Sequence, residues 1–216
     1  MSDKKVNFDE VLMTIGAVIF AAMLFIPFSA VVMDVFARMV FVLASAILIY
    51  SLTRYFKLMP KLILLYSLIS LALNISLGRL MLSGLRNGIT EPQLSFMSAK
   101  INGGLLINIL FLVFFVATII FLLVGTKRIA EKAVRMDLVG SVKFLAGNVK
   151  ASLFMVLIEF AGGTLIEKYL NGRSMLESIT NVVALTTENV KLFLPSLVLV
   201  SIAIGFKITK QSREDA

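Results

Sequence analysis

The sequence predicts an all-α integral membrane protein, a polytopic bundle of about six spanning helices with additional amphipathic or half-membrane helices. Two features of the composition support this prediction: 59% of the 216 residues are hydrophobic, and only 16% are charged. Soluble domains contain about a quarter charged residues, so a large soluble domain is excluded. The third observation is a series of nearly charge-free stretches close to the length that crosses a bilayer core about 30 Å thick.

The chain contains no Cys and no His. Disulfides and thiolate chemistry are therefore excluded, as are the common metal, proton-relay and nucleophile-activating sites that use His. We expect no metal and no cofactor. Since no catalytic constellation and no phosphate-binding glycine loop is recognisable either, we expect the protein not to be an enzyme.

Residues 1–10 form a polar tail, and residues 11–124 are predicted to hold a first group of four transmembrane helices. The first helix covers the charge-free stretch Val11–Met33, with Pro27 near its outer end. A cleaved signal peptide is the alternative. The apolar run is longer than a typical signal core, which favours a retained helix.

The second helix is expected to begin near Asp34 and to end before a basic turn at residues 54–61. Asp34 and Arg38 are four residues apart, the spacing at which opposite charges meet on one helix face. Two interpretations stay open. The pair is solvated at the membrane surface, or Arg38 snorkels outward or pairs inward as a partner of a carboxylate.

The third helix, Lys61–Met81, is apolar enough to cross a bilayer but carries Asn74 and Arg79. At helical spacing, one of its faces carries a stripe of polar and small residues, namely Ser67, Ser70, Asn74 and Gly78. Lipid disfavours such a stripe, so we expect it to face protein or water. Asn74 is predicted to join helices by hydrogen bonds or to line a pore. Arg79 is predicted to be interfacial or to pair with Asp34 or Glu159.

A loop at residues 83–104, rich in turn-forming residues, leads to the fourth helix, Leu105–Val124. Residues 125–150 are expected to form a basic cytoplasmic linker that contains an amphipathic interfacial helix. Its charged face is either a solvated surface without function or a coupling surface for a partner. The residues of this face are Lys127, Arg128, Glu131, Arg135 and Asp137.

A second transmembrane group is expected at residues 151–208, followed by a charged cytoplasmic tail at residues 209–216. Residues 171–191 are interpreted as a surface or half-membrane helix, and Leu192–Ile208 as the last spanning helix. The candidate positions for helix packing or helix breaking in the chain are Gly78, Gly162, Gly163, Pro195, Ser201 and Gly205.

Glu159 is the strongest candidate for chemistry inside the membrane. A charged side chain at the centre of a membrane helix costs at least about 2.5–3.5 kcal/mol on insertion scales, so its presence needs a reason. Two interpretations stay open: a carboxylate that responds to protons or cations, or a neutral or Arg-paired structural group. Gly162 and Gly163 follow on the same side of the helix and leave room for water or a close neighbour.

The Lys and Arg residues predict the orientation of the chain. With six crossings, the side that holds the N-terminus carries twice as many of the 21 Lys and Arg residues as the other side. The positive-inside rule then places both termini in the cytoplasm. We therefore expect a multi-pass protein of the cell inner membrane. The net charge of +8 is attributed to its cytoplasmic loops, not to nucleic-acid binding.

Several segments carry a resemblance to a known family, in order along most of the chain. They begin with Asp34, the LALN segment at residues 71–74 and Arg79. GTKRIAEKAVRMDL follows, and then FAGG, NGRSMLESI, ALTTENV, LFLPSLVLVSIAIG and KITK. This succession resembles the transmembrane part of the FHIPEP family, the large export-gate protein of flagellar and type III secretion systems.

The chain also departs from the pattern of that family. Ser70 stands where the family has an arginine, Val139 where it has an aspartate, and Asn189 where it has another aspartate. The small folded insertion between the two helix groups is reduced to residues 140–150. No counterpart of the cytoplasmic substrate-docking domain is present, so we expect a truncated, divergent relative that does not dock substrates in this way.

The resemblance implies an export-gate-like membrane component of a secretion apparatus. It implies that the chain assembles as a homo-oligomer or with other gate subunits, and that export is coupled to the movement of protons or cations. One alternative is a small ion-coupled transporter that uses Glu159 and a helix broken at Pro195. It predicts internal repeats, and none is convincing here. The other alternative is a structural membrane assembly factor, in which the same polar residues only hold helices together.

Overall fold

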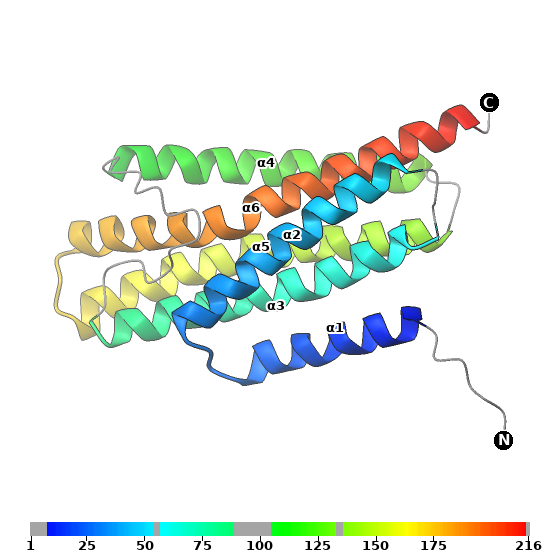
Figure 1. Ribbon diagram of the computed structural model, residues 1–216. Coiled ribbons are helices and arrows are strands. Elements are labelled where there is room, and N and C mark those ends of the chain that lie inside the picture. Colours follow the sequence, from blue (N-terminus) through cyan, green and yellow to red (C-terminus); the bar gives the residue numbers. More distant parts are fainter. Residues whose placement is uncertain (1–7, 54–56, 89–104, 133–135, 215–216) are drawn as a thin grey trace, which may run out of the picture.

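The computed structural model describes residues 8–53, 57–88, 105–132 and 136–214. Over these ranges the chain forms six α-helices and one π-helical turn (Figure 1). The elements are α1 (Phe8–Phe25), α2 (Ala30–Leu52), α3 (Met59–Arg86), α4 (Leu105–Lys132), α5 (Met136–Leu165), η1 (Ile166–Leu170) and α6 (Met175–Glu214). No strand occurs in the described ranges, and the predicted all-α bundle is confirmed.

Five of the described helices are long and apolar enough to cross a membrane. Their candidate spans are Ala30–Leu52, Met59–Arg86, Leu105–Gly125, Leu138–Leu170 and Met175–Lys207. The apolar part of α1 is shorter, Met13–Phe25. The helices run back and forth, so that α1 begins and α6 ends at the same end of the bundle (Figure 1).

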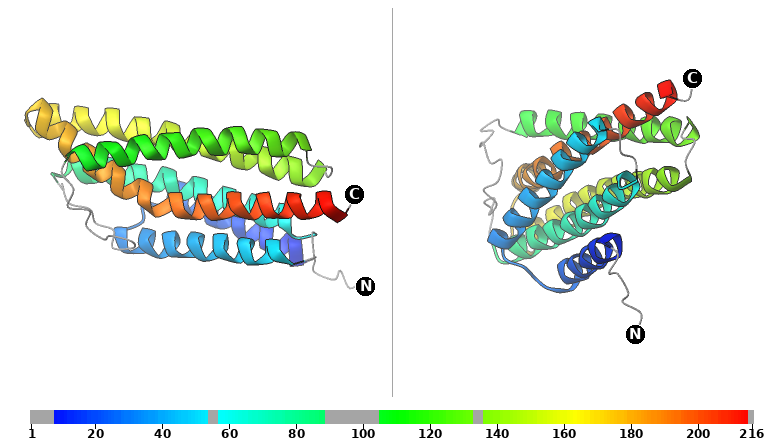
Figure 2. Two further views of the ribbon diagram at one scale, coloured as in Figure 1. Left: turned by 90° about the horizontal axis from the view of Figure 1, so that it is seen from above. Right: turned by 45° about the vertical axis from the view of Figure 1, so that its right-hand side comes forward.

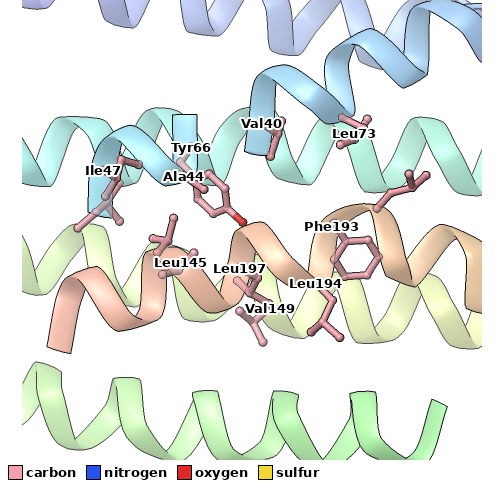
Figure 3. Packing of buried hydrophobic residues seen from close by; sticks show 14 of the residues in the cluster. Val40, Ala44, Ile47, Tyr66, Leu73, Leu145, Val149, Phe193, Leu194 and Leu197 are labelled. Atoms are coloured by element: carbon pink, nitrogen blue, oxygen red, sulfur yellow. The ribbon is translucent and has the colours of Figure 1, made fainter. Parts of the chain in front are cut away.

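The centre of the bundle is formed by α3 and α6. α3 packs against α1, α2, α5 and α6, and α6 packs against α2, α3, α4 and α5 (Figure 2). Figure 3 shows the apolar core between these helices, which includes Tyr66, Leu73, Leu145, Phe193 and Leu197. Apolar side chains gain little when they leave lipid for protein, so close packing and buried polar contacts stabilise such a core.

The break between α1 and α2 differs from the predicted one. α1 ends at Phe25 and α2 begins at Ala30, whereas one helix was expected over Val11–Met33. Pro27 lies between them. Because proline has no backbone N–H and disfavours a helical conformation in the residue before it, the helix ends here and the chain turns back.

Most of residues 125–150, the segment expected as a basic linker with an amphipathic helix, is helical. α4 continues to Lys132 and α5 begins at Met136. Leu138, Val142 and Leu145 recur at helical spacing and are buried in the core, so this part of α5 belongs to the bundle. The side chains of the predicted coupling surface lie outside the described part of the chain; they are Lys127, Arg128, Glu131, Arg135 and Asp137.

α6 is one continuous helix of 40 residues, Met175–Glu214. Residues 175–191 of the expected surface or half-membrane helix at 171–191 and the expected last helix at 192–208 are therefore parts of one element. Pro195 lies inside it. Proline removes one backbone hydrogen bond but is tolerated in membrane helices where neighbouring groups replace it, so it did not mark a break here.

Candidate intramembrane polar site

The carboxyl group of Glu159 lies inside the bundle, where α3 and α6 pack against α5. Its side chain is nearly inaccessible, since the residue is 2% exposed. Asn189 Nδ2 on α6 donates a hydrogen bond to Glu159 Oε2 at 3.3 Å. Among the described residues, no Lys or Arg forms an ion pair with this carboxylate. Within the described residues, Glu159 is therefore not paired with an arginine, as one interpretation of the sequence had it.

The other carboxyl oxygen of Glu159 occupies space that Gly78 leaves open on α3. A Cβ atom at Gly78 would lie 2.9 Å from Glu159 Oε1 and 2.9 Å from the Cε atom of Met155. Both distances are shorter than a normal contact. Gly78 belongs to the predicted stripe of polar and small residues, which we name the α3 stripe, and it is what allows a carboxylate to fit between α3 and α5.

Asn189 also approaches the sulfur of Met81 on α3. Its Nδ2 lies 3.5 Å from Met81 Sδ, and Thr186 Oγ1 lies 4.0 Å from the same sulfur. Thioether sulfur is a weak acceptor, so Glu159 offers Asn189 the stronger hydrogen bond. In the sequence, Asn189 was noted only because it stands where the family has an aspartate. Its position beside Glu159 could not be predicted, because it depends on how α5 and α6 pack.

Asn74, one turn before Gly78, connects α3 to α5. Its Nδ2 donates to Ser152 Oγ at 2.6 Å, and Ser152 Oγ donates to the backbone oxygen of Asn148 at 3.0 Å. This contact is the helix-joining hydrogen bond that was one of the two interpretations of Asn74. The whole α3 stripe is buried in the bundle, namely Ser67, Ser70, Asn74 and Gly78.

A second polar contact lies further along α3 and was missed in the sequence. The hydroxyl groups of Tyr66 and Ser196 are 3.0 Å apart. Ser196 Oγ donates its proton to the backbone oxygen of Phe193, so it accepts from the Tyr66 hydroxyl. Tyr66 is adjacent to Ser67 of the stripe. We use the name polar seam for the buried side chains between α3, α5 and α6, which are Tyr66, Asn74, Asn148, Ser152, Glu159, Asn189 and Ser196.

The predicted charges near the membrane surface are placed as follows. Arg38 pairs with Asp34 at 2.7 Å, as their spacing indicated. Arg79 pairs with neither predicted carboxylate. It donates to the backbone oxygens at the end of α1, 2.8 Å from Leu24 O and 2.7 Å from Ile26 O. Because the last carbonyls of a helix lack partners within it, this guanidinium caps α1.

The predicted packing glycines differ in how closely they are approached. A Cβ at Gly163 would lie 3.0 Å from Leu85 Cδ1 on α3 and 3.1 Å from the Cγ atoms of Val182 on α6. At Gly162 the nearest atom would be 3.5 Å away, and at Gly205 nothing lies within 4 Å. The tight approach of α5 to its neighbours is therefore at Gly163, while Ser201 only donates back to Leu197 O within α6.

Sequence reasoning missed a charged cluster at the turn between η1 and α6. The carboxylate of Glu167 is fully buried and lies 2.9 Å from Arg173 Nε. It also accepts hydrogen bonds from Asn171 Nδ2 at 2.7 Å and from Asn181 Nδ2 at 3.1 Å. Asn171 also donates to Leu85 O, so the cluster fixes the end of α3. The four-residue spacing of Glu167 and Asn171 could have indicated their hydrogen bond in the sequence.

Two Lys residues of α6 are also buried. Lys191 Nζ pairs with Glu188 at 2.6 Å, a spacing of three residues that could have indicated the pair. Lys207 Nζ donates to the backbone oxygen of Thr53, at the end of α2, at 2.8 Å. No metal-binding group of three or more acidic, His or Cys side chains occurs in the described part of the chain.

Comparison with models of known protein families, with characterised proteins and with solved structures finds no match to this chain. The resemblance to the FHIPEP family thus depends on the order and spacing of its segments alone.

Proposed function

We propose that this chain is an export-gate-like integral membrane component of a flagellar or type III secretion apparatus. In this role it lies in the cell inner membrane with both termini in the cytoplasm, as a homo-oligomer or beside other gate subunits. The observation that supports the proposal is the contact of Glu159 with Gly78 and Asn189. These residues lie at positions that resemble the family: Gly78 directly precedes Arg79, Glu159 directly precedes FAGG, and Asn189 lies in ALTTENV.

Within this proposal, Glu159 is the ion-responsive group. Its carboxyl group contacts α3 through Gly78 and α6 through Asn189, so a change of its charge acts on two helix contacts at once. An ionised carboxylate accepts the Asn189 hydrogen bond at Oε2 as a charged acceptor, which strengthens the bond. A neutral carboxyl group is a weaker acceptor and carries a donor of its own. Proton or cation binding here would therefore alter the packing of α5 against its neighbours.

The faces of α4 and α2 offer room for other subunits. α4 exposes Leu110, Phe114 and Phe121, and α2 exposes Val31 and Ile49. Lipid covers such faces in an isolated chain, and helices of other gate subunits would replace it in an assembly. This surface fits an integral membrane assembly.

Two measurements test the proposal. The tagged chain is purified in mild detergent from its native host, and secretion is compared between the parent and a deletion strain. We expect export-gate subunits to co-purify and secretion to fall in the deletion strain. Glu159→Gln should reduce secretion without loss of the protein, whereas the exposed matched control Glu177→Gln should not. A chain that purifies alone, from a host whose deletion strain secretes normally, overturns the proposal.

A small ion-coupled transporter is the second candidate, favoured by one observation: the carboxylate of Glu159 is buried and has no cationic partner among the described residues. Intramembrane carboxylates of this kind mark ion pathways. Flux into liposomes that contain the chain alone, abolished by Glu159→Gln, would favour this candidate. If Glu159→Gln is silent while Gly163→Leu prevents assembly, the chain acts as a structural assembly factor.

A further inference from the structure

α1 and α2 follow each other in the chain but separate after the turn that joins them. Figure 1 shows the two helices diverging from this turn towards the end of the bundle at which α1 begins. Within the described part of the chain, α1 packs against α3 and against no other helix. One side of α1 is therefore left without a protein neighbour next to α2.

An apolar cavity of about 220 Å³ lies between α1, α2 and α3. It is lined by apolar side chains and by Gly16; Ile15 comes from α1, Met39 from α2, and Leu65 and Ile69 come from α3. Ile15 and Met39 are half-exposed, whereas Leu65 is buried. The cavity thus has α3 as its floor and opens between α1 and α2 to the lipid that surrounds a membrane bundle.

The lining of this cavity determines what can occupy it. Water does not fill an apolar cavity without polar partners, and empty space deprives the surrounding side chains of dispersion contacts. A helix of another chain is about 10 Å across with its side chains, which is too wide for this volume. A single acyl chain is narrow enough and is present at high concentration at the opening. The cavity therefore fits the tail of a lipid.

The floor of the cavity leads to two basic residues at the start of α3. Leu65 faces α1, because a Cβ at Gly16 would collide with Leu65 Cδ1. Ser76 faces α1 as well, since its Oγ donates to a backbone oxygen of α1 at 2.6 Å. Lys61 lies on the same face of α3, one helical turn before Leu65. Lys57 is exposed and directly precedes the helix.

These two lysines lie at the depth of a lipid headgroup. Leu65 is six residues beyond Met59, the first residue of α3, a rise of about 9 Å. Side chains on a helix point towards its N-terminus, so Lys61 extends away from the cavity and out of the bundle. Basic residues beside membrane helices attract anionic lipid headgroups. A lipid with its phosphate at this position has its tail at the level of the cavity.

We propose that the chain binds one anionic phospholipid between α1 and α2, with an acyl chain in the cavity and the phosphate beside Lys57 and Lys61. The lipid holds α1 against the bundle on the side that no described helix covers. The site stands on the cavity and the neighbouring lysines, and it does not depend on the secretion function proposed above.

The test uses the purified full chain in detergent, stripped of lipid by repeated washing. Thermal unfolding is followed with dioleoyl phosphatidylglycerol, with dioleoyl phosphatidylcholine and with glycerol phosphate. A ligand that binds only the folded state stabilises it, so phosphatidylglycerol should raise the midpoint by about 2–4 °C and reach a plateau. Phosphatidylcholine has the same tails without net charge and should act only at higher concentrations. Glycerol phosphate has no tail and should have no effect.

Two substitutions test the cavity. Leu43→Phe on α2 enlarges a lining side chain and should abolish the rise in midpoint with phosphatidylglycerol. If this variant does not fold, Ile15→Phe, at the half-exposed rim, replaces it. Leu106→Phe is the matched control, because this exposed residue of α4 lies outside the cavity. It should respond to phosphatidylglycerol like the parent.

A double variant tests the headgroup position. Lys57→Gln combined with Lys61→Gln should raise the half-saturating concentration of phosphatidylglycerol at least about tenfold and should leave that of phosphatidylcholine unchanged. The control combines Lys143→Gln with Lys150→Gln. Both residues are exposed on α5, a helix that packs against neither α1 nor α2 in the described chain.

Equal responses to phosphatidylglycerol and phosphatidylcholine would overturn the proposal, because the lysines would then select no headgroup. An unchanged response in Leu43→Phe and Ile15→Phe would overturn it as well, since the lipid would then bind elsewhere. None of these results bears on secretion, which the deletion strain tests separately.

Discussion

Glu159 Oε1 on α5 lies where a side chain at Gly78 on α3 would have to be, since a Cβ at this glycine would be 2.9 Å from that oxygen. The α3 stripe and the intramembrane acid are thus parts of one contact. Exposure of either feature to lipid would cost free energy. Their mutual contact places both of them against protein.

Gly78→Leu should destabilise the bundle, because its side chain takes the space of the Glu159 carboxyl group and the Met155 methyl group. Overpacking of this kind costs about 1–3 kcal/mol. Denaturant unfolding in detergent measures the loss. Gly147→Leu is the matched control, because an added Cβ at that exposed glycine of α5 meets open space. Equal losses in the two variants would contradict the importance of the Gly78 contact.

Arg79→Leu should loosen the end of α1, because the guanidinium donates to the backbone oxygens of Leu24 and Ile26. Charge-assisted hydrogen bonds to such groups are worth about 1.5–3 kcal/mol. Hydrogen exchange at the last turn of α1 should accelerate, while exchange in α5 should not. Arg86→Leu, at the exposed end of α3, is the control. Unchanged exchange in α1 would show that Arg79 does not cap it.

Glu167→Gln should destabilise the turn between η1 and α6. The change removes the charge that pairs with Arg173 and replaces one acceptor oxygen by a donor, close to the Asn171 and Asn181 amides. Each buried donor left unpaired costs about 1–3 kcal/mol. Limited proteolysis between residues 166 and 175 and thermal unfolding report the loss. Glu177→Gln is the control for an exposed acid of the same region. A glutamine can accept the same hydrogen bonds from Ser174 at the start of α6, so both readouts should change little.

The sequence predicted the bundle and the location of the α3 stripe because apolar length and helical spacing are local properties. It also singled out Glu159 and Gly78, although not their contact, since the partner of a membrane helix depends on the packing of the whole bundle. The break at Pro27 and the continuity of α6 through Pro195 show what local sequence cannot predict, namely whether a proline ends a helix. The same residue type ended one helix and was accommodated inside another.

The Glu167 cluster and the place of Asn189 were missed for a related reason. Glu167 is followed by Lys168, so the sequence around it has the appearance of a solvated turn. Its burial comes from Asn181 on α6, several helical turns further along the chain, and from the end of α3, which is distant in sequence. Polar residues near a helix end are therefore ambiguous until the neighbouring helices are placed.

A double-mutant cycle between Glu159 and Asn189 should detect their hydrogen bond as a coupling energy. Residues in direct contact commonly couple by about 0.5–3 kcal/mol, whereas distant pairs are additive within about 0.5 kcal/mol. Unfolding free energies are measured for Glu159→Met, which removes the acceptor, for Asn189→Leu and for the double variant. The control cycle combines Glu159→Met with Asn181→Leu, because Asn181 donates to Glu167 instead. Equal coupling in both cycles would mean that the Asn189–Glu159 contact at 3.3 Å contributes nothing specific to the bundle.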